Sequence, residues 1–194
     1  MSSEAEEDLE NVDPVLHQCL KKVFEKQVRV VESNPKDSWA WLRLANLALK
    51  TGPDNEAVEV FEDTVLHAKD SYLGWFLLGN LMGRLQMWSK AESAYRKAIQ
   101  LERDDAALWI NLGGVFKVQG RFSAALRALL RAVELNPEHT TAWLDLASVY
   151  SELGDNVGCR AALERACDTD PLSVKEYIKA IEEQSSNASD CSGS

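Results

Sequence analysis

The sequence predicts an all-α protein built as a solenoid of stacked helical hairpins. Three observations favour this fold class. Tryptophan recurs with a spacing of 34 residues, at Trp41, Trp75, Trp109 and Trp143. Apolar residues follow each tryptophan with helical spacing, and five prolines and ten glycines in 194 residues are few for a protein rich in sheet turns. A fixed period of this length indicates supersecondary units that bury their apolar faces only by stacking.

The first helix of each repeat is predicted from an apolar face at i, i+3, i+4 and i+7, counted from the tryptophan. The third residue is a leucine and the fourth is small, which lets a neighbouring helix approach closely. The leucines are Leu44, Leu78, Leu112 and Leu146, and the small residues are Ala45, Gly79, Gly113 and Ala147.

A second apolar face, at i, i+4 and i+7, predicts a second helix in each repeat. It begins at Ala57, Ala91, Ala125 and Cys159. Between the two faces lie Gly52, Gly120 and Gly154, while Gln86 takes this position in the second repeat. A glycine there accepts a left-handed backbone and ends the first helix.

Two further helices are expected to flank the repeats. Asp13 and Pro14 have the form of an N-cap and a first helical residue, which predicts an N-terminal capping helix over residues 13–34. Ser173-x-x-Glu176 has the form of a capping box and predicts a C-terminal capping helix over residues 173–184, with Val174, Tyr177, Ile178 and Ile181 as its buried face. Residues 1–12 and 185–194 are expected to be disordered.

The repeated residues resemble the tetratricopeptide-repeat family. The third repeat, from Trp109-Ile110-Asn111-Leu112-Gly113 to Asn136-Pro137, fits the family pattern best, and the first departs most. The resemblance implies a right-handed α-α superhelical solenoid of four units, with the first helix of each unit lining a concave groove. The expected units are residues 38–71, 72–105, 106–139 and 140–172.

The resemblance also implies that a partner peptide lies in that groove. Counting from the repeated tryptophans gives the residues expected to line it. These are Trp39, Leu42, Asn46 and Lys50 in the first unit, Phe76, Asn80 and Arg84 in the second, and Ile110 and Lys117 in the third. The apolar members would anchor a partner, the amides can pair with a peptide backbone, and the basic residues favour a ligand that is apolar and acidic. Two simpler interpretations stay open: the basic residues are solvated helix ends, and Trp39 packs against the N-terminal helix.

Two known ligand modes of the family fit this sequence poorly. Members that bind Hsp70 or Hsp90 tails hold a carboxylate with a clamp of lysine, asparagine and arginine residues. Asn46 and Asn80 match that clamp, but Leu42, Ala107 and Asn111 replace its basic members. A sugar-transferase relative uses a ladder of asparagines, of which only Asn111 is present.

Composition narrows the remaining function classes. A formal net charge of −10 disfavours nucleic acid as a partner. No apolar run reaches the length of a membrane span, and the acidic N-terminus differs from a signal peptide, so we expect a cytoplasmic or nuclear protein with free cysteines. His17, His67 and His139 lack a second ligand at helical spacing, and no phosphate loop, dinucleotide motif or nucleophile elbow is present. We therefore expect no metal, no cofactor and no enzymatic activity.

Three functions remain for test. The leading hypothesis is an adaptor or assembly subunit that binds a protein segment in the groove. The second is a structural or self-associating subunit that uses its convex face, with the groove idle or filled by its own tail. The third is an enzyme with a hidden site.

Overall fold

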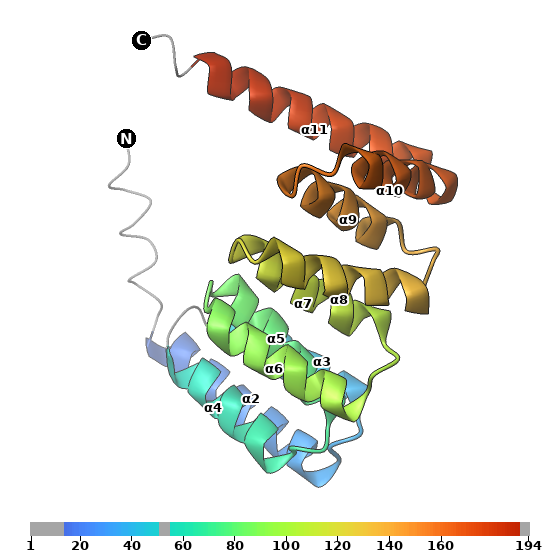
Figure 1. Cartoon of the computed structure of the whole chain (residues 1–194). Helices are drawn as coiled ribbons and strands as arrows, with labels where there is room; N and C mark the ends of the chain where they lie inside the picture. The colour runs from blue at the N-terminus through green and yellow to red at the C-terminus, as the bar shows by residue number, and fades with distance from the viewer. Residues whose placement is uncertain (1–13, 51–54, 191–194) are drawn as a thin grey trace. The chain divides into compact units, whose positions relative to one another are not determined.

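The structure, a computed structural model, describes residues 14–50 and 55–190, which are all-helical with no strand (Figure 1). The helices are α2 (Pro14–Ser33), α3 (Ser38–Lys50), α4 (Asn55–His67), α5 (Tyr72–Arg84), α6 (Trp88–Leu101), α7 (Ala106–Val118), α8 (Phe122–Leu135), α9 (Thr140–Glu152), α10 (Asn156–Thr169) and α11 (Pro171–Asp190). The chain divides into two compact units, Met1–Leu101 and Glu102–Ser194, and each is described by itself.

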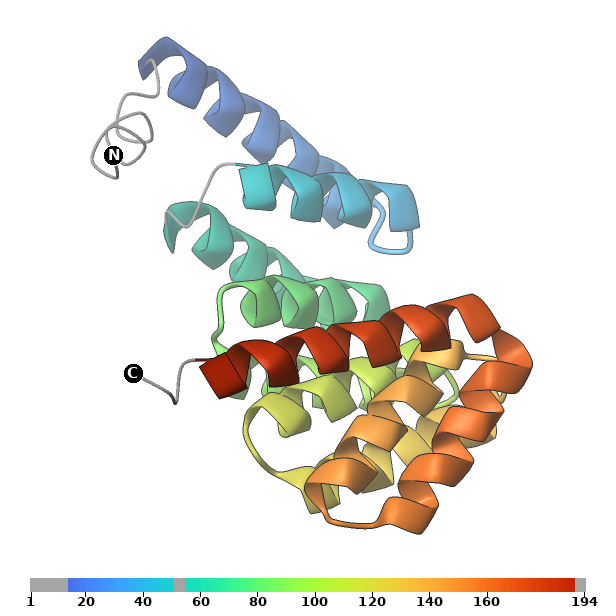
Figure 2. The same cartoon turned by 90° about the horizontal axis from the view of Figure 1, so that it is seen from above.

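Helix hairpins are the building element of both units (Figure 2). In unit 1, α5 and α6 pack along each other, and α3 contacts α2, α4 and α5. In unit 2, α7 packs on α8, α8 on α9 and α9 on α10, and α11 contacts α9 and α10. The first helices of the hairpins begin at Ser38, Tyr72, Ala106 and Thr140, so the 34-residue spacing of the tryptophans is also the spacing of the helices.

Each repeated tryptophan ties its helix to the loop that precedes it. The indole Nε1–H donates a hydrogen bond to a backbone carbonyl six residues earlier in every repeat. The bonds run from Trp41 to Pro35 (2.8 Å), Trp75 to Lys69 (2.9 Å), Trp109 to Arg103 (2.8 Å) and Trp143 to Pro137 (2.7 Å). The tryptophan therefore satisfies a loop carbonyl while its ring fills space between helices, which explains why no other aromatic residue takes this position.

Small residues stand where a ring or branched side chain from another helix meets the backbone. A Cβ at Gly79 would lie 2.5 Å from the Tyr95 ring, and one at Gly113 would lie 2.7 Å from Leu129. Gly74 makes the same allowance for Trp41, whose ring is fully buried and meets Phe61 edge to face at 5.9 Å. The small positions of the sequence pattern are thus sites of close helix approach.

The first helix of a hairpin ends in the same way in three repeats. Gln86, Gly120 and Gly154 all have positive φ, and the N–H of the next residue returns to a carbonyl of the last turn, as from Met87 to Met82 at 2.9 Å. This is the Schellman ending. Gly52 lies outside the described residues. Gln86 is the one non-glycine in the described ranges with positive φ, at 58°, so the second repeat holds a left-handed residue that has a Cβ.

The N-terminal helix α2 continues the pattern of the second helices. Val31 on α2 and Val65 on α4 are 34 residues apart and both are fully buried. Gln27 of α2 donates a side-chain hydrogen bond to the carbonyl of Ala40 on α3 (3.2 Å). Asp13, the expected N-cap, lies outside the described residues.

The C-terminal helix differs from the expectation at both ends. It begins at Pro171, and Asp170 caps it by accepting from the N–H groups of Leu172 and Ser173 (3.0 and 3.3 Å). The prediction of a capping box at Ser173 is therefore wrong, because an Asp before a Pro forms a helix start two residues earlier. The helix also runs to Asp190, through residues expected from their composition to be disordered.

Half of the expected buried face of α11 is in fact exposed. Val174 is buried and Tyr177 is half-buried, but Ile178 and Ile181 are 42% and 47% exposed. Burial raises the pKa of Tyr177, and the hydrogen bond from Ser148 of α9 opposes that rise. Tyr177 therefore fixes the start of α11 against α9, and the later turns of α11 present apolar residues outward.

Replacement of Trp41 by alanine is expected to lower the free energy of unfolding of unit 1 by about 3–5 kcal/mol. The indole is fully buried, and its loss also leaves the Pro35 carbonyl without its donor. Trp75→Ala should cost clearly less, because Trp75 is half-buried and water can reach the Lys69 carbonyl. Urea unfolding followed by far-ultraviolet circular dichroism measures both. Equal losses from the two variants would contradict the difference in burial.

Gln86→Gly is expected to stabilise unit 1 by about 1 kcal/mol, because glycine removes the steric cost of a left-handed residue and keeps both hydrogen bonds of the helix ending. Gln119→Gly is the matched control, since Gln119 has φ of −77° and glycine there should destabilise. Thermal unfolding of the two variants measures the change. A lower melting temperature for Gln86→Gly would show that the side chain makes a compensating contact.

Candidate functional site

The expected groove residues of unit 1 lie open to solvent on α3. Trp39 is 71% exposed, Leu42 is 38% exposed, and Asn46 is exposed at the next position of the same helix face. The interpretation that Trp39 packs against the N-terminal helix is therefore wrong. The side chain of Lys50 lies outside the described residues.

The matching residues of α5 are more firmly held. Asn80 accepts a hydrogen bond from the Tyr95 hydroxyl through its Oδ1 atom (2.7 Å), and the Phe76 and Tyr95 rings lie 6.3 Å apart. Burial raises the pKa of Tyr95 well above its ordinary value, so this phenol stays a donor at any physiological pH. Asn80 and Phe76 are half-buried and Arg84 is exposed at the end of the helix. Tyr95 thereby fixes the orientation of the Asn80 amide.

In unit 2 the equivalent positions are used internally, which corrects two expectations. Ile110 is buried, at 9% exposed, so it is not an exposed anchor. Lys117 of α7 forms an ion pair with Asp145 of α9, so its charge is neutralised within the unit. The sequence places Lys117 and Asp145 on the first helices of consecutive repeats, and this arrangement could have indicated the pair. Ser148, at the position of α9 equivalent to Asn80 of α5, bonds to Tyr177 of α11.

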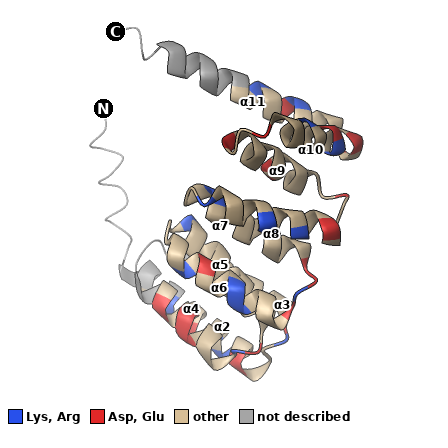
Figure 3. Ribbon diagram, in the orientation of Figure 1, with Lys and Arg blue, Asp and Glu red and all other residues tan. Residues whose placement is uncertain are grey.

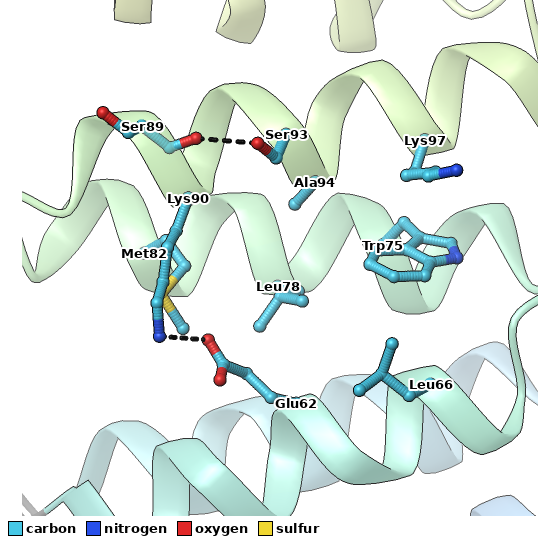
Figure 4. Close-up of a pocket in the computed structure, with 10 residues that line it drawn as sticks. All are labelled: Glu62, Leu66, Trp75, Leu78, Met82, Ser89, Lys90, Ser93, Ala94 and Lys97. Carbon is cyan, nitrogen blue, oxygen red and sulfur yellow. Dashed lines mark hydrogen bonds and ion pairs between the residues drawn. The ribbon is translucent and has the colours of Figure 1, made fainter.

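An apolar slot that the sequence pattern did not predict lies in unit 1 between α4 and α6, with α5 as its floor (Figure 4). Its volume is about 480 Å³. Leu78 and Met82 are buried at the floor, Trp75 is half-buried beside them, and Leu66 on the rim is 57% exposed. The slot was not predicted because its residues come from two repeats. Residue spacing within one repeat does not give the distance between α4 and α6, the second helices of consecutive repeats.

Charge differs between the two walls of this slot. Of the residues that line the slot, α4 contributes Glu62, whereas α6 contributes Lys90 and Lys97. Figure 3 shows the acidic and basic residues of the helices. Lys90 reaches across one end of the slot to Glu62 (2.9 Å), and Lys97 lies beside Trp75 at the other end (Figure 4).

Groups that could carry chemistry are scattered in the described part of the chain. No cluster of three or more His, Cys, Asp or Glu residues there could hold a metal ion. Cys19, Cys159 and Cys167 are free thiols, and His67 Nδ1 lies 2.7 Å from the Asp63 carbonyl oxygen of its own helix. The side chain of His17 is outside the described residues. No helix that the structure describes is both long enough and apolar enough to cross a membrane.

Comparisons with known proteins agree with this architecture. A family model described as a tetratricopeptide repeat matches residues 115–174. No curated protein sequence matches the chain. Among solved structures, MamA is similar with a TM-score of 0.65 and 19% identity, over 81% of this chain and 86% of that one.

A second similar structure is that of TTC0263, a thermophilic TPR protein of Thermus thermophilus. Its TM-score is 0.62 at 23% identity, over 86% of this chain and 91% of that one. These similarities and the all-helical secondary structure confirm the predicted fold class, an all-α helical solenoid. Residues 115–174 therefore match the tetratricopeptide-repeat family, and the chain has the helical-solenoid fold of the similar structures.

Proposed function

We propose that this protein is an adaptor or assembly subunit that binds a segment of another protein on the face of unit 1 formed by Trp39, Leu42, Asn46, Phe76 and Asn80, here named the α3–α5 face. The observation that carries the proposal is the exposure of Trp39. A tryptophan that is 71% exposed gains little from folding, whereas large aromatic side chains dominate the energy of protein interfaces.

The five residues share one side of unit 1 by their positions in the repeat. Leu42 and Asn46 on α3 lie 34 residues before Phe76 and Asn80 on α5, and the two helices are in contact. Equivalent positions on neighbouring, equivalent helices face the same way. Apolar side chains of a partner would contact Trp39, Leu42 and Phe76, while the two amides pair with its backbone.

The hydrogen bond from Tyr95 holds the Asn80 amide in one orientation before a partner binds. The phenol occupies the Oδ1 atom, and no described residue accepts from the amide nitrogen, so that nitrogen can donate to a partner carbonyl. The fixed rotamer reduces the entropy lost on binding. Arg84, at the end of α5, favours a segment that carries Asp or Glu, since Lys117 is already paired.

A co-chaperone role has less support than the adaptor role. The clamp for a terminal carboxylate needs basic residues where Leu42, Ala107 and Asn111 stand, and the Asn111 side chain donates to the Ala107 carbonyl of its own helix (2.9 Å). Without those charges the free energy of binding a carboxylate falls sharply.

Self-association is a second candidate, favoured by the exposed apolar residues of α11. Leu172 is 74% exposed, and Ile178 and Ile181 are each nearly half exposed. Exposed apolar groups on one helix are typical of surfaces that pair with another chain. In this alternative the assembly would depend on α11 and not on the α3–α5 face.

The test combines partner capture with surface variants. The full chain is used to capture partners from its native cells, and partners are identified by mass spectrometry and then titrated by calorimetry. Trp39→Ala is expected to weaken binding by about 2 kcal/mol, or roughly thirtyfold, as for an interface anchor. Val157→Ala, at a site 77% exposed in unit 2, is the matched control and should bind as the unmodified chain does.

Circular dichroism distinguishes lost binding from lost folding, because removing an exposed side chain should change stability by no more than about 0.5 kcal/mol. Unchanged affinity in Trp39→Ala would overturn the proposal. Light scattering at two concentrations tests the second candidate: an oligomer that is abolished by Ile178→Ser and kept by Trp39→Ala would favour self-association.

A further inference from the structure

The apolar slot between α4 and α6 lies on a different side of unit 1 from the α3–α5 face. Both surfaces include residues of α5. At about 100° per residue, Trp75, Leu78 and Met82 point roughly 150° away from Phe76 and Asn80 around the helix axis. A ligand in the slot therefore leaves the α3–α5 face free.

The shape of the slot defines what can enter it. Lys90 and Glu62 join α6 to α4 across one end, and Leu66, Trp75 and Lys97 lie at the other end (Figure 4). The volume of about 480 Å³ accommodates two large apolar side chains. Leu66, Trp75 and Leu78 offer them apolar surface, and the fully buried Met82 lies at the floor.

The positive charge of Lys97, at the end of the slot opposite Lys90, favours a ligand that carries an acidic group. Of the three charged residues that line the slot, Glu62 and Lys90 neutralise each other, which leaves Lys97. Lys97 forms no ion pair with any residue that the structure describes. On a chain of net charge −10 this is a local positive site next to an apolar surface.

We infer that the α4–α6 slot is a second docking site, and that its occupant is a segment of a partner protein carrying two large apolar side chains followed by an acidic residue. The apolar side chains contact Leu66, Trp75 and Leu78, and the carboxylate contacts Lys97. The chain can then hold one partner in the slot and another on the α3–α5 face, which is the arrangement of a scaffold.

The three methionines of the sequence provide a direct readout. Met82 lies at the slot floor, while Met87 lies in the turn before α6 and does not line the slot. The full chain is labelled with ¹³C at the methionine methyl groups and titrated with an acetylated ten-residue peptide. The peptide carries Phe and Leu three residues apart, followed by two Asp residues. A second peptide with Lys in place of both Asp residues is the charge control.

The acidic peptide is expected to shift the Met82 methyl signal more than that of Met87, through the ring current of its Phe. Lys97→Glu should weaken this binding about fivefold, as expected when one exposed ion pair is lost. Lys26→Glu, on the exposed surface of α2, is the matched control and should leave it unchanged. Leu66→Ser should weaken binding, and Val118→Ser, at an equally exposed site, should not.

Several results would overturn the inference. The first is the absence of a Met82 shift at millimolar peptide, and the second is equal binding of the acidic and basic peptides. The third is a Met82 shift that grows with protein concentration in the absence of peptide, because a second copy of the chain would then be the occupant. Binding that is lost in Trp39→Ala and kept in Lys97→Glu would also overturn it, because the peptide would then lie on the α3–α5 face. Failure here leaves the proposed function standing.

Discussion

The hydrogen bond from each repeated indole to the carbonyl six residues before it is the constraint on which the rest of the structure depends. It fixes the start of the first helix of a hairpin to the loop that ends the preceding helix, in Trp41, Trp75, Trp109 and Trp143 alike. The loop carbonyl gains a donor and the indole N–H gains an acceptor, in a fully buried side chain for Trp41 and in half-buried ones for the other three. A single tryptophan makes this hydrogen bond and also fills the space between helices. The first helices of the hairpins therefore recur with the same 34-residue spacing as the tryptophans.

With the hairpins held in this way, the two units use the same positions differently. On α3 and α5, the side chains at the expected groove positions are exposed or half-buried, as for Trp39 and Asn80. On α7 and α9, the side chains at these positions make contacts within the unit: Lys117 pairs with Asp145, and Ser148 bonds to Tyr177 of α11. The repeat pattern thus provides equivalent surfaces, and individual substitutions decide which of them remain available to a partner.

Features that repeat along the chain could be predicted from the sequence, whereas features that depend on pairs of residues from different helices could not. The helices, the close approach at Gly79 and Gly113 and the left-handed position of Gln86 all follow from the period, since backbone conformation and small size leave a local signature. The burial of Ile110, the start of α11 at Pro171 and the α4–α6 slot do not, because they depend on how one helix packs on another. The Asp170 cap is an instructive case: two valid N-cap signals stood three residues apart, and the proline at 171 favoured the earlier one.

Hydrogen exchange of the indole N–H groups, followed by NMR, measures directly whether the four indole–carbonyl bonds hold. The chain has six tryptophans, of which four occupy the repeated position. We expect slow exchange for Trp41, Trp75, Trp109 and Trp143, slowest for the fully buried Trp41, and fast exchange for the exposed Trp39. Indole signals of the four that exchange as fast as that of Trp39 would contradict it, since the carbonyl bonds would then not hold the helices in place.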